Sequence, residues 1–168
     1  MLNFKANHIL LCLMSLVAFL VGCSPSSPPN DDTLLETFRT HRSDFEILAN
    51  MLIEDTDLQK VARGYTRPDD VYGLGISRQR ILDYHELLKK LNLLSVERHQ
   101  EGVSLTAFAG GALPDDGIYK GYVYFPDGLP AKLGPSLVDS LDNLAWNPDH
   151  VTSLYRQVDE NWYLWFLA

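Results

Sequence analysis

Trp162-Tyr163-Leu164-Trp165-Phe166-Leu167 is the stretch of sequence that decides the fold, because all six side chains are large and none is charged. Successive side chains of a β-strand point to opposite faces of the sheet. Trp162, Leu164 and Phe166 therefore share one face, and Tyr163, Trp165 and Leu167 share the other. Since neither face is polar, we expect a strand in the middle of a sheet. Helices would cover one face, and the other would be covered by loops, pack on a partner or form an aromatic groove.

Five segments bounded by turn residues predict strands, and the C-terminal stretch is the last of them. They are Leu94–Arg98, Val103–Ala109, Ile118–Phe125, Val151–Val158 and Trp162–Leu167. No long helical pattern separates these segments, so an antiparallel sheet is favoured over parallel crossovers. Leu58–Tyr65 is compatible with a further short strand, and Leu137–Leu144 with a short helix.

Two segments show the three- and four-residue spacing of apolar side chains that is typical of helices. The first runs from about residue 33 to 54, where Thr33 and Glu36 fit a capping box. Its apolar face consists of Leu34, Phe38, Phe45, Leu48, Ala49 and Leu52. The second begins after Ser77 as N-cap and ends at Asn92, which tolerates the left-handed conformation. We therefore predict an α+β fold with two main helices packed on a mostly antiparallel sheet of about five strands.

The N-terminal segment has the features of a secretory signal. Lys5 precedes the run Ile9–Val21, which only Ser15 interrupts. Thirteen helical residues span about 20 Å, less than the roughly 30 Å of a bilayer core, so the run is too short for a transmembrane anchor. The run closes on Leu20-Val21-Gly22-Cys23, which resembles the lipobox of bacterial lipoproteins. A plain secretory signal with a chance cysteine is the alternative.

The lipobox resemblance implies that the signal is cut before Cys23 and that this residue carries a diacylglycerol and an acyl chain. No other cofactor is expected. Ser24, where an inner-membrane protein of this family often has Asp, favours the outer membrane, facing the periplasm. Residues after the cysteine are rich in Pro and Ser and read as an extended tether. The expected organisation is a signal peptide over 1–22, a lipidated cysteine and tether over 23–31, and a single α+β domain over 32–168.

A second resemblance covers short segments of the domain. His41-Arg42-Ser43-Asp44-Phe45, Lys120-Gly121-Tyr122 and Asn161-Trp162-Tyr163-Leu164 are similar to segments of a group of small uncharacterised bacterial exported proteins. The resemblance implies one domain that reaches from the first helix to the C-terminus. It implies no activity and no functional residue.

Charge and motif content exclude several classes of function. The net charge is −8, and becomes −9 when Lys5 leaves with the signal, so a nucleic-acid partner is disfavoured. Ser77–Phe108 has the outline of a winged-helix DNA-binding unit, but its acidic side chains would repel phosphate. The histidines lack metal-ligand spacing, and no serine lies in a Gly-x-Ser-x-Gly turn. We therefore assign no metal ligand and no catalytic residue.

The candidate binding residues are few. They are His41, Arg42, Tyr122, Trp162 and Trp165. His41 shares the apolar side of the first helix, so we expect it to be buried and hydrogen-bonded. Trp165 lies on the face of the last strand that the helices are not expected to cover.

Three functions fit these observations. The first is a non-catalytic, lipid-anchored envelope protein that binds another envelope protein. The second, suggested by the negative charge, is an inhibitor or immunity-type binder of a basic envelope enzyme. The third is a small periplasmic hydrolase, suggested only by histidines and carboxylates that have no assigned role.

Overall fold

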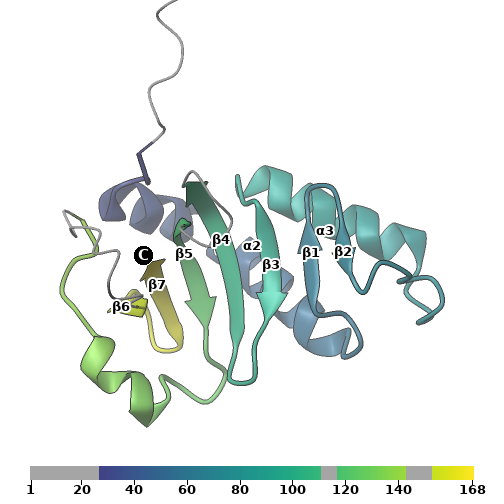
Figure 1. Ribbon diagram of the computed structural model, residues 1–168. Helices are drawn as coiled ribbons and strands as arrows, with labels where there is room; N and C mark the ends of the chain where they lie inside the picture. Colours follow the sequence, from purple (N-terminus) through teal and green to yellow (C-terminus); the bar gives the residue numbers. More distant parts are fainter. Residues whose placement is uncertain (1–26, 111–116, 143–152) are drawn as a thin grey trace, which may run out of the picture.

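One antiparallel sheet forms the centre of the computed structural model, which describes residues 27–110, 117–142 and 153–168 (Figure 1). Within these ranges it has seven strands in the order β2-β1-β3-β4-β5-β7-β6. Their bounds are β1 Lys60–Ala62, β2 Thr66–Arg67, β3 Ser95–Arg98, β4 Val103–Gly110, β5 Ile118–Tyr124, β6 Ser153–Gln157 and β7 Trp162–Leu167. The predicted α+β class is confirmed, with more strands than the five expected.

The additional strands are β1 and β2, which are three and two residues long. Strands this short show too few alternating side chains for a clear pattern. β1 lies within the segment 58–65 that is compatible with a strand. All five predicted strands are present where the structure describes them, while Val151 and Thr152 lie outside the described residues.

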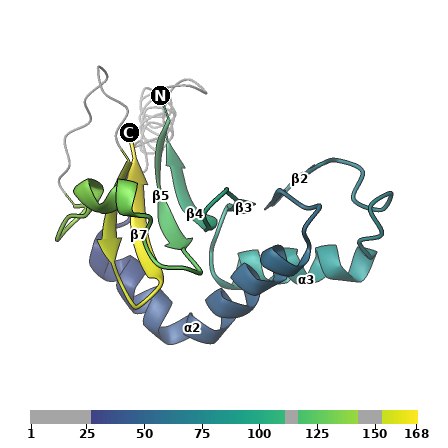
Figure 2. The same cartoon turned by 90° about the horizontal axis from the view of Figure 1, so that it is seen from below.

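Helices α2 (Asp31–Glu54) and α3 (Arg78–Lys90) both cover the same face of the sheet (Figure 2). α3 begins after Ser77, whose hydroxyl accepts the N–H of Arg80, and Asn92 has a φ of 52°, as predicted. α2 begins earlier than predicted, because the side chain of Asn30 accepts the N–H of Thr33 at 2.8 Å. The predicted capping box at Thr33 is therefore wrong, and Thr33 lies inside the helix.

The core lies between α2 and the sheet. The predicted apolar face of α2 is buried, and its aromatic rings meet those of the strands. Phe38 and Phe45 lie 5.3 and 6.0 Å from the ring of Trp162, and Phe45 lies 4.5 Å from that of Tyr122. Aromatic pairs at such distances stabilise a core beyond the area that they bury.

β7 lies inside the sheet, between β5 and β6, which confirms that it is no edge strand. Trp162, Leu164 and Phe166 are buried on the helix side. On the other face Tyr163 is buried, while Trp165 and Leu167 are only partly covered. The helices therefore leave part of the second apolar face of β7 accessible.

The helix predicted over 137–144 is wrong for residues 137–142. A 3-10 helix, η1 (Ala131–Ser136), precedes this segment, and Leu137 forms a parallel bridge with Tyr155 of β6. The N–H of Val138 donates to the carbonyl of Tyr155 at 2.8 Å, so pairing with the sheet replaces helical hydrogen bonds here. Residues 143 and 144, like the predicted signal peptide, Cys23 and the first part of the tether, lie outside the described residues.

Candidate functional site

A concave surface crosses the face of the sheet opposite the two helices. Its cavity volume is about 560 Å³, and Lys132 and Leu133 of η1 border it. η1 itself lies beside β6 (Figures 1 and 2). We call this surface the sheet groove. Its lining residues are Lys60, Glu97, His99, Glu101, Ser104, Thr106, Tyr119, Val123, Phe125, Lys132, Leu133, Ser153, Tyr155, Trp165 and Leu167.

Strand register brings side chains from distant parts of the sequence into this groove. One row across the sheet pairs Lys60 with Glu97 and Glu97 with Ser104. A second row pairs Thr106 with Gly121, Gly121 with Trp165 and Trp165 with Tyr155. Paired residues of neighbouring strands point to the same face. The polar row and the aromatic row therefore open on the same side.

Gly121 keeps the middle of the second row free of side-chain atoms. A Cβ at this position would collide with the carbonyl oxygen of Leu105, because β4 approaches β5 closely beside its bulge between Thr106 and Phe108. Glycine is needed where two backbones approach in this way.

Aromatic rings form the η1 end of the groove. Phe125 lies 6.0 Å from Tyr155 and 5.7 Å from Tyr163, and with Val123 they form a small apolar cluster. Leu129 and Leu133, before and within η1, pack against it. Burial raises the pKa of Tyr155 above its ordinary range, so its hydroxyl stays a neutral hydrogen-bonding group.

Ion pairs also line the groove, one between β1 and β3 and the other at η1. Lys60 Nζ lies 2.6 Å from Glu97, and Lys132 pairs with Glu101. Burial of Lys60 disfavours its charged form, but the hydrogen bond and the charge of Glu97 outweigh this effect and raise the pKa of Lys60. Lys60 therefore remains charged near neutral pH, and it forms an ion pair with Glu97.

His99 and Ser104 form a close hydrogen bond, with 2.6 Å between Nε2 and Oγ. This distance suits a nucleophile and its base. Acyl transfer also needs a group that orients the histidine and donors for the oxyanion. In the described ranges no carboxylate bonds to His99, and the backbone around Ser104 pairs with β3 and β5. Within the described ranges, the pair therefore stands without these two groups.

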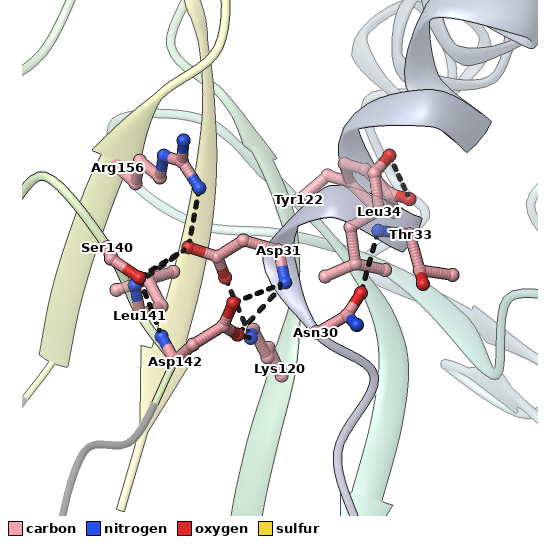
Figure 3. Close-up of polar contacts among 10 residues, drawn as sticks. All are labelled: Asn30, Asp31, Thr33, Leu34, Lys120, Tyr122, Ser140, Leu141, Asp142 and Arg156. Atoms are coloured by element: carbon pink, nitrogen blue, oxygen red, sulfur yellow. Dashed lines mark hydrogen bonds and ion pairs between the residues drawn. The ribbon is translucent and has the colours of Figure 1, made fainter.

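A second polar cluster joins the start of α2 to β5, to β6 and to residues 140–142 (Figure 3). Asp31 pairs with Lys120 at 2.7 Å and with Arg156 at 2.8 Å, and it accepts the N–H of Leu141 at 2.8 Å. Asp142 bonds to Lys120 at 2.8 Å and accepts the N–H of Asp31. We call these four charged side chains, Asp31, Lys120, Asp142 and Arg156, the ionic clasp.

The ionic clasp connects parts of the chain that are more than 80 residues apart in sequence. Asp31 and Lys120 are almost fully buried. Asp31 also pairs with Arg156, and Lys120 also pairs with Asp142, so two negative and two positive charges balance. Burial opposes ionisation of Asp31, but the hydrogen bonds from Lys120, Leu141 and Arg156 outweigh it and lower the pKa of Asp31. The four side chains pair with one another, which fits a structural role.

The predicted binding residues do not form one site. His41 lies at a kink in α2 and is about one third exposed, 3.4 Å from Asp44, so its expected burial is not observed. Arg42 is exposed and pairs with Asp159 at 2.8 Å beside a smaller cavity of about 190 Å³ that Trp162 also borders. Tyr122 is buried and donates its hydroxyl to the carbonyl of Leu34 at 3.0 Å. Trp165 alone among them lies in the sheet groove.

The remaining groove residues and the ionic clasp were missed by the sequence reasoning. The two apolar faces of β7 were the available signal for the groove. Asp31 was placed in the tether because no local pattern marks a residue whose partners are far along the chain.

The described ranges hold no group of three or more His, Cys, Asp or Glu side chains arranged to bind a metal ion. No helix in the part that the structure describes is long and apolar enough to span a membrane. Comparison with protein-family models, with curated proteins and with solved structures finds no match for this chain.

Proposed function

We propose that this protein is an exported, lipid-anchored envelope protein whose domain is a non-catalytic binding module, with the sheet groove as its binding surface. The observation that carries the proposal is the groove itself. Both helices pack on one face of the sheet, and the opposite face presents partly exposed aromatic side chains in a cavity of about 560 Å³. Clefts of this size that combine aromatic walls with a few polar groups are typical of binding sites.

The proposed anchor is supported by the sequence Leu20-Val21-Gly22-Cys23 and by the Pro- and Ser-rich segment that follows it. One acyl chain holds a protein only reversibly, whereas several chains on one cysteine give stable attachment. Ser24 after the cysteine supports the outer membrane, with the domain in the periplasm. The tether would place the groove at a distance from the bilayer.

The contacts in the groove support a binding module of another kind than an inhibitor of a basic enzyme, and they give less support to a hydrolase. Glu97 and Glu101 are each neutralised by a lysine, so the groove does not offer the unpaired carboxylates that an inhibitor of a basic enzyme would use. A hydrolase would need more than the hydrogen bond between His99 and Ser104. Both alternatives therefore receive less support than a binding module.

Photo-crosslinking in living cells tests the proposal. Thr106 lies on the groove face, and its replacement by benzoylphenylalanine should give an adduct on irradiation. Leu82, which is 48% exposed on α3, is the matched control position and should give none. Equal adducts at both positions, or an adduct at position 82 alone, would show that the groove is not the binding surface.

A further inference from the structure

We propose that the sheet groove binds a neutral oligosaccharide. This inference rests on the proposed function, because it names the class of ligand for the same surface. It follows from three properties of the groove, namely its charge balance, its aromatic wall and the pairing of the strand backbones beneath it.

The charge balance disfavours an ionic ligand. Lys60 and Glu97 form an ion pair at 2.6 Å in which both side chains are mostly buried. Lys132 also pairs with Glu101, but its side chain is 65% exposed, so the charge balance rests mainly on the first pair. An anion near Lys60 would be repelled by Glu97, and a cation near Glu97 would be repelled by Lys60, unless the ligand breaks the pair. Breaking such a partly buried pair leaves an uncompensated charge. A neutral ligand leaves both pairs intact.

Paired ions still offer hydrogen bonds at their free positions. An ammonium group has three donors, and a carboxylate has about four acceptor sites, so one partner does not saturate either. Thr106 adds a hydroxyl group to the groove, and the hydroxyl of Ser104 is hydrogen-bonded to His99. This mixture of donors and acceptors suits a ligand with many hydroxyl groups, each of which donates and accepts.

The aromatic wall requires apolar surface on the same ligand. Tyr119, Tyr155 and Trp165 line the groove and are all partly exposed. The Nε1–H of Trp165 is shielded from solvent and has no acceptor in the described part of the chain. A buried donor without an acceptor is unfavourable, and a ligand hydroxyl that reaches it after a small shift of the ring would supply the acceptor. A sugar ring has C–H faces that pack on aromatic rings and a rim of hydroxyl groups.

A peptide fits the groove less well. An extended peptide gains affinity by adding a strand to the edge of a sheet, where backbone groups are free. The groove lies over β1, β3, β4, β5 and β7, which pair on both sides, and over β6 at the edge of the sheet, where Leu137 forms a bridge with Tyr155 and the N–H of Val138 donates to the carbonyl of Tyr155. A peptide would have to leave its own backbone groups unpaired here, whereas a saccharide has no such backbone.

Calorimetry and tryptophan fluorescence on the full lipidated chain test the inference. The protein is purified in a detergent without a sugar headgroup and titrated with two neutral probes, chitotetraose and cellotetraose. We expect at least one of them to bind. The substitutions Trp165→Ala and Tyr119→Ala should each raise the Kd about tenfold or more, because each removes an aromatic contact. Tyr72→Ala, which removes a 60% exposed tyrosine outside the groove, should leave the Kd unchanged.

Far-UV circular dichroism shows which variants fold. If Trp165→Ala does not fold, Tyr119→Ala still tests the inference. The inference is overturned if neither probe binds at about 10 mM, if binding is unaffected in the folded groove variants, or if a sulfated tetrasaccharide binds more tightly. If no saccharide binds but position 106 crosslinks to a protein, the saccharide inference is wrong and the proposed function stands. If both experiments fail, both proposals fall.

Discussion

Replacement of Asp31 by Asn should destabilise the domain strongly, although the residue lies next to the predicted tether. Asn is close to Asp in size, so the change removes a charge and creates little empty space. Lys120 is 2% exposed and would keep only Asp142 as an anionic partner. Arg156 would lose its carboxylate partner at 2.8 Å.

The expected loss follows from the burial of this pair. Removing one partner of a buried ion pair costs about 3–5 kcal/mol, because a charge is left uncompensated. The whole free energy of unfolding of a domain is only about 5–15 kcal/mol. Lys90→Ala is the matched control, since Lys90 also pairs with an aspartate at 2.8 Å but its side chain is 52% exposed. This control should cost less than about 1 kcal/mol.

Urea unfolding followed by tryptophan fluorescence measures both variants on the protein without its signal peptide. The double variant Asp31→Leu with Lys120→Met should be more stable than either single variant, because apolar side chains often replace a buried ion pair without loss. A cost of under about 1 kcal/mol for Asp31→Asn would refute the assigned role of the clasp.

Three further predictions concern the N-terminal part of the chain, from Cys23 to Asp32. The pKa of Asp31 is lowered in the folded protein, so its contribution to stability is complete above about pH 4 and is lost as the pH falls through the folded pKa. Lowering the pH should therefore reduce the free energy of unfolding of the wild type more than that of Asp31→Asn. A protein that begins at Asp32 should melt several degrees below one that begins at Ser27, and equal melting temperatures would contradict the clasp. Globomycin treatment or Cys23→Ala should leave unprocessed precursor in the membrane fraction, whereas normal cleavage after Gly22 would exclude the lipobox.

Local patterns were sufficient to predict most of the fold. Ser77 accepts the N–H of Arg80 as an N-cap, and Asn92 takes a positive φ, because both effects depend on neighbours in sequence. The alternation in β7 predicted a strand with two apolar faces, and pairing on both sides agrees with it. The same reasoning placed the start of α2 at Thr33, since it gave no weight to Asn30.

Long-range contacts could not be predicted in the same way. Asp31 meets Lys120 and Arg156 through the sheet topology, and nothing within one or two turns of Asp31 indicates these partners. The groove likewise depends on register, which sets Trp165 opposite Gly121 and Tyr155. Tyr122 was a candidate binding residue in the sequence, yet it is buried, because even-numbered residues of β5 face α2.

The two tryptophans of β7 offer the most direct test of the claim that one face of this strand stabilises the fold while the other binds. Trp162 is 3% exposed among Phe38 and Phe45, so Trp162→Ala should cost about 3–5 kcal/mol in urea unfolding. Trp165 is only partly covered, so Trp165→Ala should cost about half as much and abolish the crosslink from position 106. The claim is contradicted if Trp165→Ala retains the crosslink at wild-type yield, or if it destabilises the domain as much as Trp162→Ala.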